Sequence, residues 1–349
     1  MNKFSNIILF MLSKKINVGI VGATGLVGEK VLKILEERKF PVNKLSLFSS
    51  KRSEGQKILF ASEEIEVSAL SKDSFKNLDI AFFAIEENLA KEWIPLARKE
   101  CIVIDKSSAF RLDEEVPLVI PEVNPEKIKE HKNLISNPNC TTIPLVVVLA
   151  PLYKAFGLKR VVVSSFQSVS GAGKDAVNEL LYETEVIAYG DKIKKDSDSF
   201  FSSPIAANII PQIGSIDKQG YASEERKIIE ETRKILELPE LPISATCVRV
   251  PVLVGHCEAV NIEFDVNIKV DDVMKVLKSA SGIKVYPDNK YPMPIDVEEK
   301  DDVHVARIRK DIAFEHGIAL WLAADNLRKG AATNAVQIAE EILKTRGEK

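Results

Sequence analysis

Short apolar runs alternate with amphipathic segments through the first third of the chain. Uninterrupted apolar runs bounded by turn residues are typical of buried parallel strands, and apolar positions that recur every three or four residues are typical of helices on a sheet. The pattern predicts strands at 16–21, 44–48, 79–85 and 101–105, and helices at 29–38 and 88–99. This alternation indicates an α/β fold with a doubly wound sheet.

The rest of the chain has strands and helices in a less regular order. Pro138 keeps Asn137 out of the helical region, which predicts a turn before a helix at 141–156. Segment 185–203 is charged and rich in serine, so we expect an exposed, mobile loop, and Ser223 is a candidate N-cap. Further strands are predicted at 158–167, 242–253, 303–309 and 317–323, and further helices at 174–183, 223–236 and 331–345.

Length and charge narrow the possible functions. The 349 residues exceed the ~250–300 that usually share one core, so we expect two domains. A net charge of −3 without a basic cluster argues against nucleic acid and membrane surfaces as partners. No apolar stretch approaches the ~18 residues of a membrane span. Residues 1–13 are expected to be an N-terminal extension, with Met11 as a candidate start.

The four cysteines are expected to be reduced thiols in the cytoplasm, because no secretory signal is recognisable and the chain is long. No Cys/His cluster has the spacing of a zinc site, so no metal is expected.

Cys140 is the strongest catalytic candidate. It lies between the predicted turn and the predicted helix, where free N–H groups and the positive end of the helix dipole stabilise a thiolate. Such surroundings lower a thiol pKa from ~8.5 into the ~3.5–7.5 range. The alternative is a buried cysteine that acts only as a small apolar side chain.

The segment from Gly22 to Gly28 joins the first strand to the first helix. In this context one glycine permits the tight turn, the next lets a pyrophosphate approach the backbone, and the third allows close packing of helix and strand. The phosphates would lie at the helix N-terminus, and the alternative is a turn without a ligand. The candidate cofactor-binding residues here are Gly22, Thr24, Gly25, Leu26, Val27 and Gly28.

The end of the second predicted strand indicates which dinucleotide is preferred. An NAD site usually has Asp or Glu at this point for the ribose hydroxyls. Here Ser49 to Ser53 contains hydroxyls and cations, with no carboxylate before Glu54. We therefore predict NADP(H) rather than NAD(H), with Arg52 and Ser53 at the 2′-phosphate. The alternative is that Arg52 belongs to a solvated loop.

His256 and Arg249 lie close together in the second half of the chain. Imidazole suits a general acid/base near neutral pH, and a guanidinium offers a planar fork for a carboxylate. A lone histidine can also be purely structural. Cys257 is a competing nucleophile, but it lies in an apolar, strand-like segment without a helix N-terminus.

Together these motifs resemble the aspartate-semialdehyde dehydrogenase family over roughly residues 15–345. The family's usual Asn-Cys-Ser-Thr is Asn-Cys-Thr-Thr here, which keeps the hydroxyl. The segments that carry the resemblance are Gly22–Gly28, Asn137–Thr142, Phe166–Gly173, Glu224–Lys227, Arg249–His256 and Asp325–Ala332.

The resemblance implies a Rossmann-type domain and an α+β catalytic and dimerisation domain, as in semialdehyde and glyceraldehyde-3-phosphate dehydrogenases. Residues 14–139 with 326–349 would bind NADP, and 140–325 would carry catalysis and dimerisation. The last helix would pack on the first domain. The protein would be a homo-oligomer, a dimer or a tetramer.

The resemblance also implies a reaction in the biosynthesis of lysine, diaminopimelate, threonine, methionine and isoleucine. NADPH would reduce β-aspartyl phosphate to aspartate semialdehyde and phosphate through a Cys140 thioester. His256 would move the proton, and Gln167 would orient His256 or the substrate.

Substrate contacts follow from the same resemblance. Arg249 would bind the carboxylate and Glu224 the ammonium group, while phosphate would contact Arg111, Lys227 and Asn139. Ser170, Gly171 and Asn326 would contact the cofactor. Alternatively, Glu224 and Lys227 form only a surface pair worth ~0.2–0.5 kcal/mol, and Arg111 pairs with Asp113.

Four alternatives were also considered. N-acetyl-glutamyl-phosphate reductases usually have Gly in place of Asn139 and bind no ammonium group, so Glu224 argues against them. A malonyl-CoA reductase would use the same nucleophile without phosphate. A non-enzymatic NADP-binding sensor would not need Cys140 and His256, and a cysteine hydrolase would leave the glycine segment unexplained.

Overall fold

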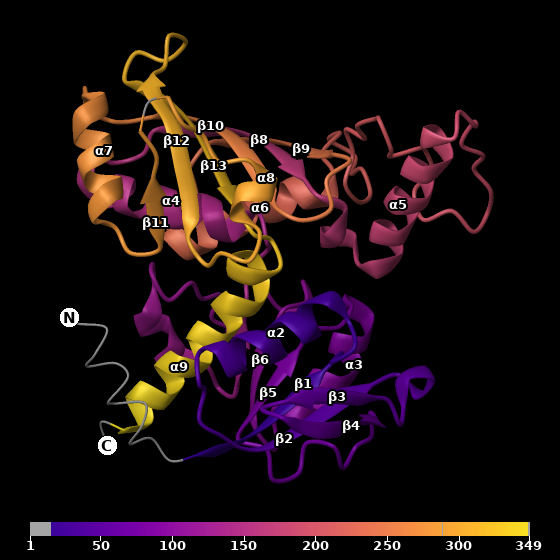
Figure 1. Cartoon of the computed structure of the whole chain (residues 1–349). Helices are drawn as coiled ribbons and strands as arrows, with labels where there is room; N and C mark the ends of the chain where they lie inside the picture. Colours follow the sequence, from indigo (N-terminus) through magenta and orange to yellow (C-terminus); the bar gives the residue numbers. More distant parts are fainter. Residues whose placement is uncertain (1–14, 288, 348–349) are drawn as a thin grey trace. The chain divides into compact units, whose positions relative to one another are not determined.

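The computed structural model describes residues 15–287 and 289–347, so the predicted N-terminal extension lies outside the described residues. The chain forms two compact units (Figure 1). One unit is the chain up to Pro138 with the segment from Ala331 onward, and the other runs from Asn139 to Gly330. Asn139 and residues 326–330, which were predicted in the first domain, therefore belong to the second unit.

The first unit contains a seven-stranded sheet in the order β3-β4-β2-β1-β5-β6-β7. All neighbouring strands are parallel except β3 and β4. The direction of winding reverses beside β1, which is where ligands bind in open α/β sheets. The strands are β1 (Ile16–Val21), β2 (Val42–Ser49), β3 (Lys57–Phe60), β4 (Glu63–Ala69), β5 (Ile80–Phe83), β6 (Ile102–Asp105) and β7 (Leu134–Ser136).

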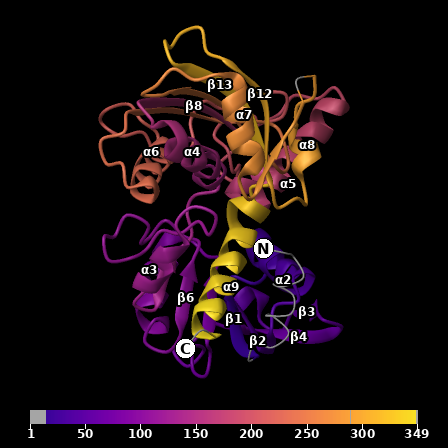
Figure 2. The same ribbon diagram turned by 90° about the vertical axis from the view of Figure 1, so that its left-hand side faces the viewer.

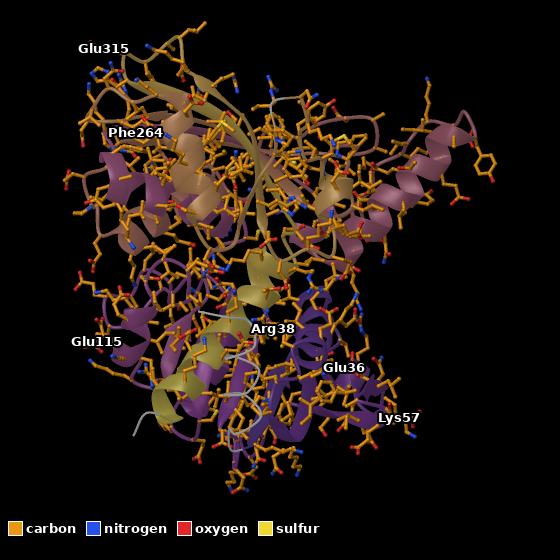
Figure 3. The ribbon with its side chains drawn as sticks, turned by 60° about the vertical axis from the view of Figure 1, so that its left-hand side comes forward. Glu36, Arg38, Lys57, Glu115, Phe264 and Glu315 are labelled. Carbon is orange, nitrogen blue, oxygen red and sulfur yellow. The ribbon has the colours of Figure 1, made fainter. Side chains whose placement is uncertain are left out.

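Helices cover both faces of this sheet, as predicted. On one face, side chains of α2 (Leu26–Glu37) and α9 (Thr333–Gly347) join the core formed by β1. On the other face, α3 (Glu87–Ala97) packs against β5 and β6. Arg38, labelled in Figure 3, donates two 2.6 Å bonds to Glu340 on α9. The last helix, α9, thus packs on the seven-stranded sheet of the first unit.

The second unit contains a six-stranded mixed sheet in the order β11-β12-β13-β10-β8-β9. Helices α4, α6 and α7 pack together and against the strands (Figure 2). The strands are β8 (Arg160–Gln167), β9 (Ile243–Arg249), β10 (His256–Glu263), β11 (Ile283–Val285), β12 (Val303–Lys310) and β13 (Gly317–Ala324). The helices are α4 (Thr142–Phe156), α5 (Lys174–Ala188), α6 (Ser223–Leu236), α7 (Val270–Ser279) and α8 (Pro294–Val297).

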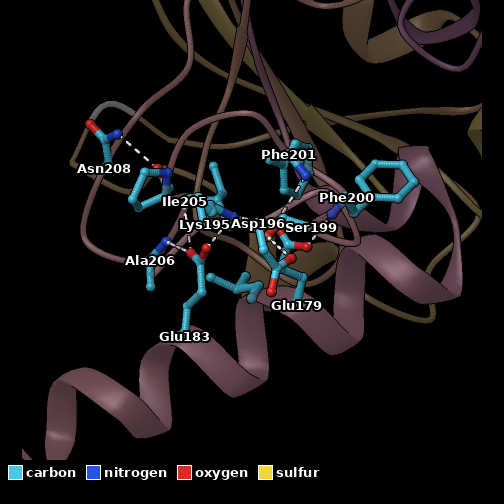
Figure 4. Close-up of polar contacts among 12 residues, drawn as sticks. Glu179, Glu183, Lys195, Asp196, Ser199, Phe200, Phe201, Ile205, Ala206 and Asn208 are labelled. Carbon is cyan, nitrogen blue, oxygen red and sulfur yellow. Dashed lines mark hydrogen bonds and ion pairs between the residues drawn. The ribbon is translucent and has the colours of Figure 1, made fainter. Parts of the chain in front are cut away.

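The segment predicted as a loose loop at 185–203 is more ordered than its composition suggests. Helix α5 continues to Ala188. Beyond it, Lys195 forms ion pairs of 2.5 Å with both Glu179 and Glu183 (Figure 4). Glu179 also accepts the backbone N–H groups of Phe200 and Phe201. Lys195 thus attaches the segment to α5, while most residues after Ala188 are exposed, as predicted.

Two predicted element boundaries were also wrong. The N-cap of α6 is Ala222, not Ser223, because Glu225 reaches back to accept the backbone N–H of Ala222 at 2.7 Å. The strand predicted at 242–253 ends at Arg249, because Pro251 follows and cannot donate to a ladder. Across the described ranges, no helix combines the length and apolar composition needed to cross a bilayer.

Candidate active site

Cys140 lies at the start of α4. Its neighbour Asn139 accepts the backbone N–H groups of Thr141 and Thr142 on Oδ1, at 2.8 and 3.3 Å. These bonds fix the first turn of the helix next to the sulfur. The remaining N–H groups and the positive end of the helix dipole favour a thiolate at this position.

The other three cysteines lie in the core. Burial raises the pKa of Cys101 and of Cys257 to about 12, and it also raises the pKa of Cys247. Cys140, in contrast, is only half-buried. A buried thiol with a raised pKa is a poor nucleophile at neutral pH, so the geometry favours Cys140 over Cys257.

His256 is the first residue of β10, and its Nε2 lies 3.4 Å from Sγ of Cys140. The backbone N–H of Ser168 donates to Nδ1 of His256 at 3.1 Å. Because this N–H can only donate, Nδ1 is the acceptor, and the neutral ring carries its proton on Nε2. The proton therefore faces the sulfur. Burial and the nearby Arg249 lower the pKa of His256 to about 3, so the ring is neutral at physiological pH.

Arg249 ends β9 and is almost completely buried, at 6% exposure. Its Nη1 donates to the carbonyl oxygen of Ser168 at 2.8 Å. Ser168 thus connects the guanidinium with His256. Burial lowers the pKa of Arg249, and the neighbouring Glu224 and Cys140 act in the opposite direction. A buried cation at this position suits an anionic ligand.

Gln167 pairs in register with Arg249 at the same end of the sheet. Its side-chain Nε2 donates to Ser165 Oγ at 3.2 Å. The hydrogen bonds to Nδ1 of His256 come from Ser168. The predicted role of Gln167, in orienting His256 or the substrate, stays a prediction.

Glu224 and Lys227 form more than a surface pair. Lys227 Nζ lies 3.2 Å from Oε2 of Glu224, whose side chain is only 9% exposed. Asn139 Nδ2 donates to Oε1 of Glu224 at 2.8 Å. Burial opposes ionisation of Glu224, but Lys227, Asn139 and Arg249 outweigh it and hold the pKa of this carboxyl below its usual range. The carboxylate remains charged and suits an ammonium group.

Gly171 borders both His256 and Arg249. A Cβ on Gly171 would lie 3.1 Å from Nε2 of His256 and from Nη1 of Arg249. Its φ lies outside the left-handed region, so glycine is not required by the backbone here. The missing side chain leaves space between the imidazole and the guanidinium.

Asn326 connects the loops beside His256. Its Oδ1 accepts the backbone N–H of Gly255 at 2.8 Å and the hydroxyl of Ser168 at 3.1 Å. Its Nδ2 donates to Ser170 Oγ at 3.0 Å. The predicted cofactor contacts Ser170 and Asn326 therefore lie next to the acid/base candidate.

Arg111 belongs to the first unit. Its Nε donates to the carbonyl oxygen of Asn137 at 3.0 Å, and its Nη2 donates to that of Lys106 at 2.6 Å. The side chain is buried, at 5% exposure. These bonds hold the guanidinium against the segment that precedes Asn139.

The glycine segment forms a tight turn between β1 and α2. Gly22 has a φ of +85°, and a Cβ there would lie 2.4 Å from the carbonyl oxygen of Ala84. A Cβ on Gly28 would lie 2.2 Å from the carbonyl oxygen of Gly22. Gly25 is the N-cap of α2, and Leu26 and Val27 form its first turn. This arrangement fits a pyrophosphate at the helix N-terminus.

A cavity of about 470 Å³ lies beside this turn and is lined by Gly22, Ser49 and Lys51, among others. Thr24 Oγ1 lies 2.8 Å from Ser49 Oγ and 3.4 Å from Ser53 Oγ. Lys51, rather than the predicted Arg52, borders the cavity. The size of the cavity and the glycine turn fit a dinucleotide, and the carboxylate that lines the cavity, Glu86, lies at the start of α3 rather than after β2. Within the described part of the chain, no group of His, Cys, Asp or Glu residues could hold a metal ion.

Sequence reasoning missed Ser168 and Glu231. Ser168 lies inside a motif that had been noticed, but its contact with His256 depends on the pairing of distant strands. Glu231 lies seven residues after Glu224 on the same helix, and its Oε2 accepts the backbone N–H of Asn139 at 2.6 Å. Only the helical period of buried positions could have indicated it.

Comparison with known proteins gives matches in both units. Residues 17–131 match the family described as semialdehyde dehydrogenase, NAD binding domain, and residues 149–329 match semialdehyde dehydrogenase, dimerisation domain. The aspartate-semialdehyde dehydrogenase of Aquifex aeolicus is 49% identical over 94% of this chain and 98% of that protein. The Bacillus subtilis enzyme of the same name is 45% identical over 95% and 99%.

A crystal structure of aspartate semialdehyde dehydrogenase II from Vibrio cholerae, complexed with ASA, is also similar. It has a TM-score of 0.92 and 44% identity, and the match covers 95% of this chain and 99% of that one. These findings confirm the predicted fold class, with a dinucleotide-binding domain followed by a second α/β domain.

Proposed function

The chain belongs to the aspartate-semialdehyde dehydrogenase family, and from this premise we propose that it reduces β-aspartyl phosphate to aspartate semialdehyde with NADPH and releases phosphate. The observation that carries the proposal is the 3.4 Å separation of Cys140 Sγ and His256 Nε2 at the start of α4. A nucleophile beside a proton carrier is the arrangement needed for acyl transfer through a thioester.

In the first step the Cys140 thiolate attacks the acyl carbon of the substrate. The carbon–oxygen bond to phosphate breaks, phosphate leaves with the electron pair, and a thioester forms. When bound, NADPH would supply a hydride to the thioester carbon, which gives a tetrahedral thiohemiacetal anion. The carbon–sulfur bond then breaks, giving the aldehyde and regenerating the thiolate. The Nε2 proton of His256 stabilises the anionic sulfur before attack and when it leaves.

Charges of both signs around Cys140 match the substrate. Arg249 binds the carboxylate with its planar fork, and Glu224 binds the ammonium group. Lys227 lies beside Glu224 and contacts phosphate. Asn139 contributes its second side-chain N–H to phosphate, because the first is already donated to Glu224. Arg111, held by two carbonyl oxygens, contacts the same phosphate.

The cofactor proposed is NADP(H) in preference to NAD(H). Ser49 and Lys51 border the cavity beside the glycine turn, and no carboxylate follows β2 before Glu54. Steady-state kinetics of Lys51→Ala and Arg52→Ala with both cofactors would test this preference. A larger loss for NADP⁺ than for NAD⁺ is expected with either variant, and an unchanged preference in both would contradict it.

We also propose that the protein acts as a homodimer in the cytoplasm. The match to a dimerisation domain over residues 149–329 supports the dimer. The sheet of the second unit would form the interface. Sedimentation equilibrium would give the mass of the assembly, and a monomer under assay conditions would contradict it.

The direct test is NADPH formation from aspartate semialdehyde and NADP⁺, with and without inorganic phosphate. We expect formation that depends on phosphate and is lost in Cys140→Ala. Malonyl-CoA with NADPH serves as the competing substrate. Activity with malonyl-CoA and none with phosphate and the semialdehyde would overturn the assignment.

A further inference from the structure

Asn139, the residue before the nucleophile, is fixed at every polar atom. Its carbonyl oxygen accepts the backbone N–H of Ile143 at 3.0 Å, and its Oδ1 accepts those of Thr141 and Thr142. Both acceptor atoms thus bond to the first turn of α4. Its two donor groups point to a different helix.

Both donors of Asn139 bond to carboxylates of α6. Nδ2 donates to Glu224 at 2.8 Å, and the backbone N–H donates to Oε2 of Glu231 at 2.6 Å. Glu231 lies two turns after Glu224, and only 1% of its surface is exposed. The short bond to a carboxylate is of the strong, charge-assisted kind.

This bond ties the buried side of α6 to the nucleophile segment. A buried carboxylate is stabilised by hydrogen bonds from N–H groups. Because the backbone N–H of Asn139 belongs to the residue next to Cys140, the bond from Glu231 fixes the chain beside the sulfur.

We propose that Glu231 is a positioning residue, which fixes the backbone of Asn139 and thereby aims the sulfur of Cys140 at the acyl carbon and at His256. This inference rests on the proposed function, because it assigns Glu231 to the same nucleophile. A displacement of about 1 Å at a reacting group can cost about 10²-fold in rate, so loss of one bond at Asn139 is expected to affect turnover.

Glu225 provides a matched control on the same helix. It is buried, at 8% exposure, and its carboxylate accepts the backbone N–H groups of Ala222 and Cys247 at 2.7 and 3.0 Å. Like Glu231, it accepts hydrogen bonds from backbone N–H groups, but neither of its partners belongs to the nucleophile segment. A purely structural role would give Glu225 and Glu231 similar effects.

The experiment compares Glu231→Gln, Glu231→Asp and Glu231→Met with Glu225→Gln and Glu225→Met. Gln keeps an acceptor at the same reach, Asp withdraws it by one methylene, and Met removes it at similar volume. Each variant is measured for kcat, for KM of the semialdehyde and phosphate, and for thermal unfolding. The rate at which iodoacetamide alkylates Cys140 is followed by peptide mass spectrometry.

We expect Glu231→Met and Glu231→Asp to lower kcat by about 10²-fold, with KM within a few-fold of the parent and an altered alkylation rate at Cys140. Glu231→Gln should retain most activity. Glu225→Met should lose thermal stability but keep kcat and the alkylation rate. If Glu231→Met does not fold, the Asp and Gln pair gives the same contrast.

Two outcomes would overturn the inference. One is an unchanged kcat and alkylation rate in Glu231→Asp and Glu231→Met. The other is an equal loss of kcat in Glu225→Met. Failure of the proposed function would look different, because the parent protein would then form no NADPH, while the alkylation rates would still report whether Glu231 acts on Cys140.

Discussion

The candidate site of the first unit is formed by backbone groups, and that of the second unit is formed by side chains. In the first unit, Gly22, Gly25 and Gly28 present backbone to a ligand within one strand–turn–helix segment. In the second, Cys140 is brought to His256, 116 positions away in the chain, and to the neighbouring Arg249. Ligand binding by backbone groups requires room for the ligand next to the chain, whereas ligand binding by side chains requires a particular functional group at each position. The two should therefore respond differently to substitution.

The two sheets also differ in the polarity of the side chains that they bury. The strands at the centre of the first sheet bury mainly apolar side chains such as Ile20, Ile80 and Val103, although Asp105 is buried at the end of β6. The strands of the second sheet bury Gln167, and also Glu258, whose carboxyl oxygens have no partner among the described residues. Burial raises the pKa of Glu258 well above its usual value and favours its neutral form. Asp105 of the first sheet accepts two hydrogen bonds from Ser107, whereas Glu258 is buried without such partners among the described residues, which costs stability.

The largest effect is expected at the nucleophile of the side-chain site. Cys140→Ala removes the sulfur, and turnover should fall on the order of 10⁴–10⁶-fold. Binding of NADP⁺, which belongs to the other site, should persist. Stopped-flow assays would measure turnover, and fluorescence titration would measure NADP⁺ binding. Residual turnover within tenfold of the parent would show that Cys140 is not the nucleophile.

His256→Ala removes the Nε2–H that stabilises the anionic sulfur, and kcat should fall by about 10²–10⁴-fold, the usual range for loss of a positioned proton-bearing group. The pKa of His256 lies at about 3, below its ordinary value. The neutral ring therefore persists above that pH and is lost only as pH falls through about 3. The profile of kcat/KM against pH should show no limb from this residue between pH 5 and 8. A limb near pH 6.5 that disappears in His256→Ala would contradict the assignment.

Substitutions at two glycines of the backbone site distinguish a glycine that is needed for packing from a glycine that is needed for ligand binding. A Cβ on Gly28 would meet the Gly22 carbonyl oxygen at 2.2 Å, whereas a Cβ on Gly25 would meet it at an ordinary 3.4 Å. Gly28→Ala should therefore cost about 1–3 kcal/mol of unfolding free energy. Gly25→Ala should leave stability unchanged. It should weaken the binding of NADP⁺ by about 10²-fold or less, because the added methyl group would keep the phosphate away from the backbone. Calorimetry of both variants distinguishes them, and equal stability losses would refute this contrast.

Arg249→Lys keeps the charge but removes the fork. Hydrogen bonds to charged groups contribute roughly 1.5–3 kcal/mol, so kcat/KM should fall about 10–100-fold. Binding of NADP⁺ should not change. Initial-rate kinetics against the semialdehyde would measure the loss. A variant as active as the parent would remove Arg249 from the substrate site.

Local signals in the sequence predicted the backbone site better than the side-chain site. The helix predicted at 141–156 was confirmed as α4, and the strands of the first sheet with continuous apolar runs were found. Strands β3, β4 and β7 were missed, because β3 and β4 carry charged residues on exposed positions and β7 is very short. Such strands depend on pairing with neighbours rather than on their own pattern.

Contacts between distant residues explain the remaining differences. The bond between Glu231 and Asn139 spans 92 positions, and that between Ser168 and His256 spans 88. No local pattern specifies which buried carboxylate or hydroxyl reaches a given partner. Residue type and motif could therefore indicate Cys140 and His256, but not the groups that hold them.

The most direct test of the account is to trap the acyl group on the nucleophile. The protein would be incubated with aspartate semialdehyde and NADP⁺ without phosphate, quenched in acid and analysed by peptide mass spectrometry. The account predicts an aspartyl thioester on Cys140, formed together with NADPH and removed when phosphate is added before the quench. An acyl group on Cys257, or phosphate-dependent turnover without any acylated cysteine, would contradict it.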